Sequence, residues 1–242
     1  MSRIARVATA DRLDCRLVEH RWAFAERRAE EIDRFWRARV SANPALYDGP
    51  VLLARRVDER VDAQGQATLF MDMFETRFSR FLAWRDFDFP DADVFNCFAM
   101  PAVRSADGAF LVGEMNATHS SAGALYFPAG TPDPSDLRGQ EVDLIGSLVR
   151  ELAEEAGLSA GEGVMVPGWT LVYDRQRLAC MKIIDHPASA ADILHRVRSF
   201  LAREDNPELS GAQMISRHDQ LADPRLPPFM TAFLEQMLAR AD

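Results

Sequence analysis

The sequence predicts an α/β protein in which a mixed sheet lies between helices. Short apolar runs of strand length alternate with longer stretches of helical period, in the order strands, helix, strands, helix. The chain has 242 residues and is 48% hydrophobic, which is enough to bury a substantial core. Residues 142–158 also have the periodicity and caps of one amphipathic helix, around which the rest of the chain is organised.

The first 90 residues predict a small α+β extension. Residues 3–20 have the composition of two strands, and residues 22–42 predict one long amphipathic helix. That helix is expected to end before Pro44, because proline disfavours helical backbone in the preceding residue. Residues 51–60 and 66–84 predict a strand pair, the second strand of which runs into a helix.

Residues 91–242 predict the larger domain, so the expected boundary lies near residue 90. Its first half is expected to contain two strands within 95–117, joined by a turn at 105–108, then a strand at 124–130 and the helix at 142–158. Two or three strands within 164–188 are expected next. They are followed by a helix at 188–205, a strand at 211–219 and a helix at 227–241. Strands that come before and after a helix, and are followed by further helices, predict a mixed sheet with helices on its faces.

The helix at 142–158 has clear signals at both ends. Asp143 precedes the apolar stripe and is a good N-cap, and Gly157 follows it and can adopt the left-handed conformation. The stripe consists of Leu144, Ile145, Leu148, Val149, Leu152 and Ala156.

The last turns of this helix carry three acids on about one face. Glu151, Glu154 and Glu155 are three or four residues apart, so their like charges repel. A solvated acidic face is the simplest interpretation of such a cluster. Two features favour a metal site instead: Arg150 is placed to hold Glu154, and a loop rich in Gly and Pro, residues 128–136, precedes the helix. Carboxylate oxygens with open positions beside them suit a hard divalent cation.

Residues 150–158, RELAEEAGL, closely resemble the C-terminal half of the Nudix box, G-x5-E-x7-R-E-U-x-E-E-x-G-U, where U is a bulky apolar residue. Every fixed position of that half is present. In the first half Gly130 matches the opening glycine, but Asp136 stands where the pattern has Glu. The gap from Asp136 to Arg150 is also six residues longer than the family spacing.

The extra residues are expected in the loop around 135–141, before the helix begins, where they need not disturb the acids. Asp136, Glu141 and Asp143 are the candidates for the structural role of the first acid in the box.

The resemblance implies a Nudix α/β/α sandwich that hydrolyses a pyrophosphate bond in a nucleoside diphosphate linked to another moiety. The implied cofactor is Mg²⁺, with Mn²⁺ as the alternative. The implied catalytic residues are Arg150, Glu151, Glu154 and Glu155, and the implied metal ligands are Glu151, Glu154, Glu155 and a backbone oxygen of Ala129 or Gly130. Candidates for the general base are Glu151 and a distant acid such as Glu204 or Glu208.

Residues 43–50, NPALYDGP, resemble the N-terminal extension of the Nudix subgroup that hydrolyses UDP-glucose and UDP-galactose. The alternative is a plain turn, since Asn, Pro, Asp and Gly all favour turns. The subgroup resemblance makes Arg85 a candidate phosphate contact and Phe74 and Trp84 candidate base contacts, with Gly130 as a second substrate-binding residue. It also leads us to expect that the extension packs on the Nudix domain and lines part of its cleft.

Two other functions stay open: hydrolysis of coenzyme A or acyl-CoA, and a Nudix-fold sensor that binds a nucleotide without chemistry. The net charge of −9 argues against general nucleic-acid binding, so the expected partner is a small nucleotide. Three widely spaced cysteines give no disulfide or zinc pattern, and no long apolar stretch predicts a signal peptide or membrane span. We expect a cytoplasmic monomer or homodimer without membrane contact.

Overall fold

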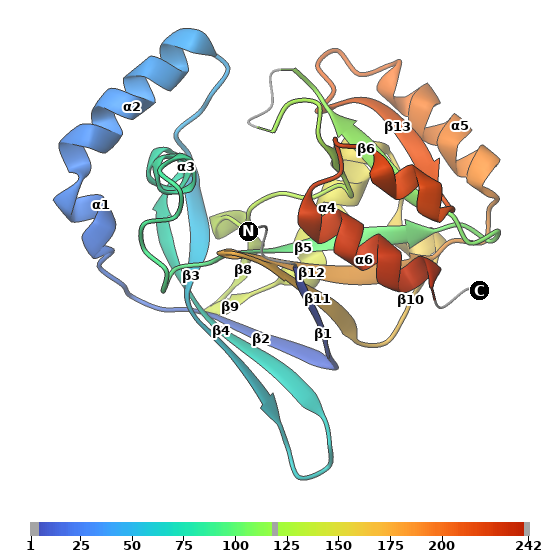
Figure 1. Ribbon diagram of the computed structural model, residues 1–242, viewed down its shortest axis with the longest axis horizontal. Coiled ribbons are helices and arrows are strands. Elements are labelled where there is room, and N and C mark those ends of the chain that lie inside the picture. The colour runs from blue at the N-terminus through green and yellow to red at the C-terminus, as the bar shows by residue number, and fades with distance from the viewer. Residues whose placement is uncertain (1–4, 118–120, 240–242) are drawn as a thin grey trace. The chain divides into compact units, whose positions relative to one another are not determined.

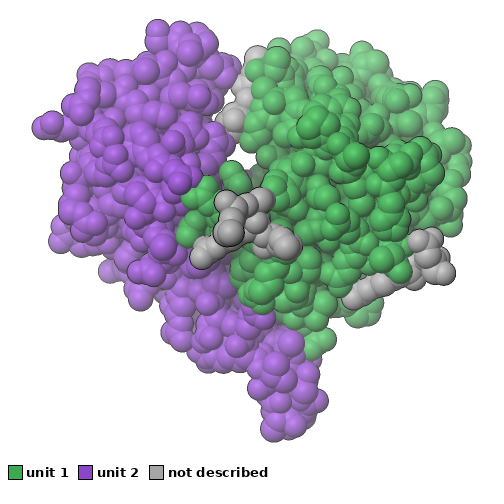
Figure 2. Space-filling model, in the orientation of Figure 1, with its two compact units in different colours: residues 1–11, 98–130, 145–242 green, residues 12–97, 131–144 purple. Residues whose placement is uncertain are grey.

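The computed structural model describes residues 5–117 and 121–239 (Figure 1). The chain forms two compact units, which Figure 2 distinguishes by colour. Unit 1 comprises residues 1–11, 98–130 and 145–242, and unit 2 comprises residues 12–97 and 131–144.

This division differs from the expected boundary near residue 90 in two places. β1 (Arg6–Ala10) pairs antiparallel with β11 (Trp169–Asp174), so the start of the chain belongs to unit 1. β9 (Glu141–Val142) pairs with β2 (Arg12–Leu17), so the segment before the box helix belongs to unit 2. Both pairings join residues far apart in sequence, which composition and local pattern do not reveal.

Unit 1 contains an eight-stranded sheet with the order β1-β11-β12-β5-β6-β13, to which β10 adds on β12 and β7 adds on β6. Its other strands are β5 (Asn96–Arg104), β6 (Phe110–Met115), β7 (Leu125–Tyr126), β10 (Val164–Met165), β12 (Arg177–Asp185) and β13 (Leu209–Ile215). The expected turn between β5 and β6 is confirmed, and Gly108 takes the positive φ of 85° that the turn needs.

Helices cover both faces of this sheet, which confirms the α/β/α class. α6 (Pro228–Leu238) packs its apolar side chains into the core on one face, and the buried leucines of α4 (Leu144–Ala156) are not part of that cluster. Figure 1 shows α6 in front of the sheet and α4 behind it. α5 (Ala190–Leu201) lies against β13. The expected end of the last helix, residues 240–241, lies outside the described residues.

Unit 2 contains a five-stranded mixed sheet with the order β3-β4-β2-β9-β8, in which β2 and β4 are parallel and the other pairs are antiparallel. The expected strand pair is confirmed as β3 (Pro50–Val61) and β4 (Ala67–Arg77), followed directly by α3 (Phe78–Asp86). The remaining short elements of the described residues are β8 (Leu137–Arg138) and the 3-10 turns η1 (Pro134–Asp136), η2 (Ala160–Glu162) and η3 (His218–Ala222).

The single long helix expected at 22–42 is wrong, because the structure has two helices there. α1 (Ala23–Arg27) and α2 (Ala29–Ala42) meet at Arg28, whose φ of −111° and ψ of 21° interrupt the helix. The Arg28 guanidinium lies 4.5 Å from the centroid of the Phe87 ring and pairs with Glu31. Tertiary packing of this kind overrides local helix propensity. No helix in the described part of the chain is long and apolar enough to span a membrane.

The insertion in the box forms a small hairpin at the edge of the unit 2 sheet. Leu137 pairs with Val142 and Arg138 with Glu141, and Gly139 takes a φ of 68° in the turn. The insertion therefore ends before α4 begins, as expected. Of the three candidate acids only Asp136 is buried; its Oδ2 accepts a hydrogen bond of 3.1 Å from the backbone N–H of Asp133.

Candidate active site

The acids of α4 are positioned by the stripe of small and leucine side chains beside them. Leu148, Leu152 and Ala156 are buried, which fixes the rotation of the helix in unit 1. Ile145, expected on the same stripe, is instead 37% exposed.

Glu151 and Glu155 share the buried side of the helix, and Glu154 does not. Glu151 is 8% and Glu155 2% exposed, whereas Glu154 is an exposed residue. An α-helix turns by about 100° per residue, so Glu155 lies about 40° from Glu151 and Glu154 lies about 60° away on the other side. The three box acids therefore occupy two environments rather than one.

The end of α4 requires glycine. Gly157 has a φ of 64°, and a Cβ at this position would overlap the ring of Phe200 on α5. The predicted left-handed glycine after the helix is confirmed, and it allows α5 to approach the end of the box helix closely.

A loop of unit 1 lies directly against the buried acids. The backbone N–H of Ala129 donates a hydrogen bond of 2.9 Å to Oε1 of Glu155. A Cβ at Gly130 would lie 2.5 Å from Oε1 of Glu151, so only glycine fits there without a shift of that carboxylate. Phe127, just before these residues, is fully buried in the core and anchors the loop.

Arg150 forms ion pairs with two of the box acids. Its Nη1 lies 2.8 Å from Oε1 of Glu151 and 3.4 Å from Oε2 of Glu154, and the second distance confirms the predicted i, i+4 pair. Arg150 thus holds one buried and one exposed carboxylate of the same helix.

Both buried acids resist ionisation when no cation is bound. Burial raises the pKa of Glu155 to about 9, and the charges of Glu151 and Glu208 add to the rise. Burial also raises the pKa of Glu151 to about 6, an effect that Arg150 opposes and that Glu208 and Glu154 increase. Oε2 of Glu155 is buried and has no hydrogen-bond partner among the described residues. A buried carboxyl group in this state is one that a cation would stabilise.

The charge of Glu208, just before β13, adds to the rise in the pKa of both buried acids. Its own side chain is exposed. Glu204, the other distant acid considered from the sequence, lies in the exposed turn that follows α5.

The donor set fits a hard divalent cation in its chemistry, because it offers carboxylate oxygens and a buried oxygen without an N–H or O–H donor among the described residues. Within residues 5–117 and 121–239, however, no group of three or more His, Cys, Asp or Glu side chains is arranged to hold a metal ion. Ala129 contacts Glu155 through the backbone N–H of Ala129, and an N–H group cannot bind a metal. The carbonyl oxygen of Ala129 and Glu154 stay predicted ligands.

Two candidate contacts in the N-terminal extension are wrong. Phe74 and Trp84 are buried in the core of unit 2, and the indole N–H of Trp84 donates to the carbonyl of Asp91. Neither ring can stack on a nucleobase without unfolding that core. Arg85 is mostly buried, and its Nε donates a hydrogen bond of 2.8 Å to Oδ1 of Asp86. Its role in substrate binding stays a prediction.

Residues 43–50 form the turn that the alternative interpretation expected. Oδ1 of Asn43 accepts a hydrogen bond from the N–H of Ala45. Oδ1 of Asp48 accepts one of 2.7 Å from the N–H of Ser79, in the first turn of α3. The segment therefore holds the start of α3. The presence of Asn43 and Asp48 is explained by these hydrogen bonds, so it does not require that they bind a substrate.

No family model matches the chain, and neither does any curated protein. Similar solved structures include the Nudix hydrolase RenU from M. smegmatis, with 18% identity over 60% of this chain and 84% of that one and a TM-score of 0.38. The MutT protein from Methanosarcina mazei Go1 has 15% identity over 61% and 96% and a TM-score of 0.41. A Nudix hydrolase from Nitrosomonas europaea has 18% identity over 60% and 90% and a TM-score of 0.40.

It is the sequence of the box helix that resembles the Nudix superfamily. The resemblance is carried by residues 150–158, which match every fixed position in the C-terminal half of the Nudix box. Likeness at these identities and TM-scores adds neither a reaction nor a substrate. The chemistry has to be inferred from the residues around the Nudix motif.

Proposed function

We propose that the chain is a divalent-metal-dependent hydrolase that cleaves a pyrophosphate bond in a nucleoside diphosphate linked to another moiety. The observation that carries the proposal is Glu155, a buried acid of the box whose Oε2 has no hydrogen-bond partner among the described residues. Burying such a group beside Glu151 costs stability unless a cation compensates it. A divalent ion at the two carboxylates would relieve that cost and would also attract a diphosphate.

The residues of unit 1 can be given separate roles. Glu151 and Glu155 would hold Mg²⁺ or Mn²⁺, and Arg150 would orient the carboxylate of Glu151 through their 2.8 Å contact. When bound, the ion supplies charge neutralisation of the phosphate oxygens and lowers the pKa of a water molecule. Ala129 fixes the rotamer of Glu155 through its N–H, and Gly130 leaves room for the carboxylate of Glu151.

Glu208 is the better of the two distant candidates for the general base. It is exposed, so it can exchange a proton with water, and its charge acts on both buried acids. A base of this kind would accept a proton from the attacking water as its oxygen bonds to phosphorus. The bond from that phosphorus to the bridging oxygen breaks in the same reaction, and the other phosphate-bearing product leaves.

The class of substrate is the finer part of the proposal. We favour a nucleotide sugar because of the resemblance at residues 43–50, although their turn is explained by α3. Coenzyme A or acyl-CoA is the second candidate, since members of that subgroup also carry an insertion within the box. A sensor without chemistry is disfavoured, because nucleotide binding alone does not require two acids buried against each other.

A hydrolysis screen, in which the phosphate-bearing products are separated by chromatography, tests this function. Nucleotide sugars, dinucleotides, coenzyme A and nucleoside triphosphates would each be incubated with Mg²⁺, with Mn²⁺ and with EDTA. We expect hydrolysis of at least one diphosphate substrate, abolished by EDTA and restored by metal. Binding of these nucleotides without hydrolysis in any metal would instead support the sensor.

A further inference from the structure

β3 forms one edge of the unit 2 sheet, and no further strand pairs with its outer side in the described part of the chain. It stands first in the order β3-β4-β2-β9-β8, and β8, at the opposite edge, has only two residues. β3 has 12 residues, which is long for an edge strand. Because an edge strand presents backbone N–H and C=O groups to its outer side, another strand can pair with it there.

The first half of this edge is already bonded within unit 2. The N–H of Leu52 donates a hydrogen bond of 2.6 Å to the carbonyl of Pro132. Ala54 and Phe95 exchange two backbone hydrogen bonds of 2.8 Å. The register with β4 then shifts at a bulge between Ala54 and Arg56. A new partner strand would therefore have to pair with the part of β3 that follows the bulge.

Three residues after the bulge direct their backbone groups outward. The N–H of Asp62, just after β3, donates a hydrogen bond of 3.1 Å to the carbonyl of Gln66, so it faces the β4 side of the hairpin. Successive residues of a strand point their backbone groups to alternate sides, so those of Val57, Glu59 and Val61 point away from β4. Val61 is also 69% exposed, although it is apolar. A second strand at this edge would bind these groups and cover Val61.

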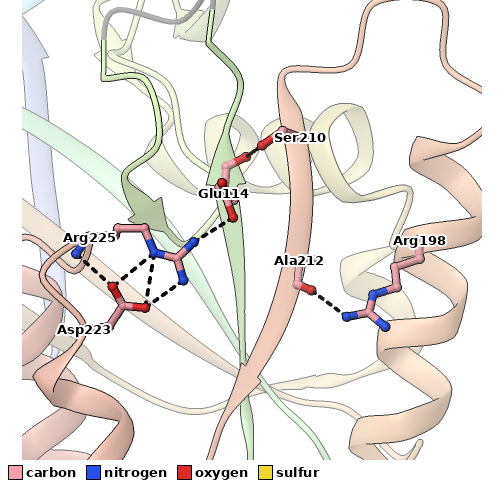
Figure 3. Close-up of polar contacts among 6 residues, drawn as sticks. All are labelled: Glu114, Arg198, Ser210, Ala212, Asp223 and Arg225. Carbon is pink, nitrogen blue, oxygen red and sulfur yellow. Dashed lines mark hydrogen bonds and ion pairs between the residues drawn. The ribbon is translucent and has the colours of Figure 1, made fainter.

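The sheet of unit 1 has an edge that is covered in a different way. β13 is the last strand in the order of that sheet, and α5 lies against it. Figure 3 shows that Arg198 of α5 donates a hydrogen bond of 3.4 Å to the carbonyl of Ala212 in β13. Covering an edge with a helix is one of the usual ways to prevent strand pairing.

β3 carries a row of charges, and their signs decide which strand it can accept. Asp58 lies between Arg56 and Arg60 and forms ion pairs with both, at 3.1 and 2.7 Å. Charges on an edge usually oppose pairing, because like charges directly opposite each other destabilise a strand pair. A partner strand must therefore place a positive group opposite Asp58 and a negative group opposite Arg60.

A second copy of β3 meets this requirement in one antiparallel register, with a twofold axis at Glu59. In each copy Asp58 then lies opposite Arg60 of the other copy, and Val57 lies opposite Val61. The outward groups of residues 57, 59 and 61 would form about six hydrogen bonds between the copies, two for each directly bonded pair. One like-charge pair remains, at the axis itself, where Glu59 lies opposite Glu59.

The two neighbouring registers that keep the outward groups paired contain more like charges. An axis at Asp58 places Asp58 opposite itself and Arg56 opposite Arg60 twice. An axis at Arg60 places Arg60 opposite itself and Asp58 opposite Asp62 twice. Each of these registers therefore has three like-charge pairs in place of one.

An axis at Val57 fails for a different reason. It places Arg60 of one copy opposite Ala54 of the other, and the outward groups of Ala54 are already bonded to Phe95. The bulge before Arg56 also breaks the alternation that such a register needs. The axis at Glu59 uses only residues that follow the bulge.

We propose that residues 57–61 of β3 are a homodimer interface, in which they pair antiparallel with the same residues of a second copy of this chain about a twofold axis at Glu59. The dimer joins the unit 2 sheets of both copies into one continuous sheet. This inference does not depend on the function proposed above.

The first test changes the charges and measures association by sedimentation velocity over a concentration series. Wild type should show a dimer whose fraction rises with concentration. Asp58→Arg and Arg60→Glu each place like charges opposite each other, so each alone should weaken association about tenfold. An equimolar mixture of the two variants should restore the dimer, because the two changed residues then lie opposite each other with complementary charges. Circular dichroism melting checks that both variants fold.

The second test fixes the position of the axis by disulfide cross-linking of the full chain with oxidised glutathione. Residues directly opposite each other in a hydrogen-bonded pair have Cα atoms about 5.5 Å apart, within the range of a disulfide. Glu59→Cys should therefore cross-link two copies. Gln64→Cys is the matched control, because Gln64 is exposed in the turn of the same hairpin but would lie roughly 30 Å from its counterpart. The three natural cysteines are buried.

Four results would overturn the inference. The first is a wild type that stays monomeric throughout the concentration series. The second is a dimer that neither charge variant weakens, which would place the interface on another surface. The third is a mixture of the two variants that associates no better than each alone, which would exclude the register. The fourth is cross-linking of Gln64→Cys as fast as that of Glu59→Cys.

Discussion

The N–H of Ala129 donates a 2.9 Å hydrogen bond to Oε1 of Glu155, and this bond joins the loop before the box insertion to the last turn of α4. It satisfies one oxygen of a carboxyl group whose other oxygen, Oε2, has no partner in the described part of the chain. The carboxyl group is therefore held in one orientation, with its second oxygen buried and the charge of Glu151 nearby.

The stability of the metal-free protein should fall as pH rises. Burial and the charges of Glu151 and Glu208 raise the pKa of Glu155 to about 9, so the folded protein keeps a proton that the unfolded chain has already released. Between the ordinary pKa of Glu and about 9 the folded state binds more protons, so each rise in pH favours unfolding. Thermal melting in EDTA across this range measures the effect, and Mg²⁺ should restore the melting temperature at the alkaline end.

Two variants of the box helix show whether Glu155 causes the fall in melting temperature with rising pH. Glu155→Gln should remove most of the fall in melting temperature, whereas Glu154→Gln, which changes an exposed acid of the same helix, should keep it. An equal fall in wild type and Glu155→Gln would show that other groups cause it.

Gly130→Ala should impair the site more than the fold. The added Cβ would lie 2.5 Å from Oε1 of Glu151, and that carboxylate is the far end of a flexible side chain that can move aside. We therefore expect a nearly unchanged melting temperature together with weaker Mn²⁺ binding and slower hydrolysis. Gly211→Ala is the control, because a Cβ there meets no atom within 4 Å. Metal binding equal to that of wild type would contradict the close approach of the loop.

Gly157→Ala should do the reverse and destabilise the fold. The residue has a φ of 64°, and the new Cβ would meet the Phe200 ring. Left-handed backbone in a residue other than glycine costs roughly 1 kcal/mol or more, and the overlap with Phe200 adds to it. Chemical denaturation would show a clear loss of stability relative to Gly211→Ala. A loss no larger than in that control would contradict the capping role.

The site was predictable where it depends on one helix. The period of α4, its closing glycine and the Arg150–Glu154 pair all follow from residue spacing within a single helix. Spacing alone did not separate Glu154 from Glu155, since both lie near Glu151, and only the packing of Leu148 and Leu152 decides which of them is buried.

What the sequence could not provide were the contacts between distant segments. Asn116 carried no local signal, because its hydrogen-bond partner Pro207 lies 91 positions further along the chain. The aromatic ring of Trp84 is of a kind that can stack on a ligand, but it is buried in the core of unit 2. The helix break at Arg28 likewise depends on Phe87, which local periodicity does not include.

The N-terminal strand gives a further prediction. Residues Arg6 to Ala10 pair with Tyr173 to Trp169 at the edge of the unit 1 sheet, and the Arg6 guanidinium lies 3.9 Å from the centroid of the Tyr173 ring. Deleting residues 1–11 should therefore lower the melting temperature, because β11 loses its outer partner. An unchanged melting temperature would show that β1 contributes little, and that truncation before residue 12 is harmless.

The most direct test of the proposed function is the activity of Glu155→Gln on the best substrate of the screen, with circular dichroism to confirm that the fold is intact. We predict that hydrolysis is nearly abolished, since the change removes the charge of a buried ligand, and that Glu154→Gln loses less. A loss of less than about tenfold in Glu155→Gln, equivalent to about 1.4 kcal/mol of transition-state stabilisation, would contradict the proposed site.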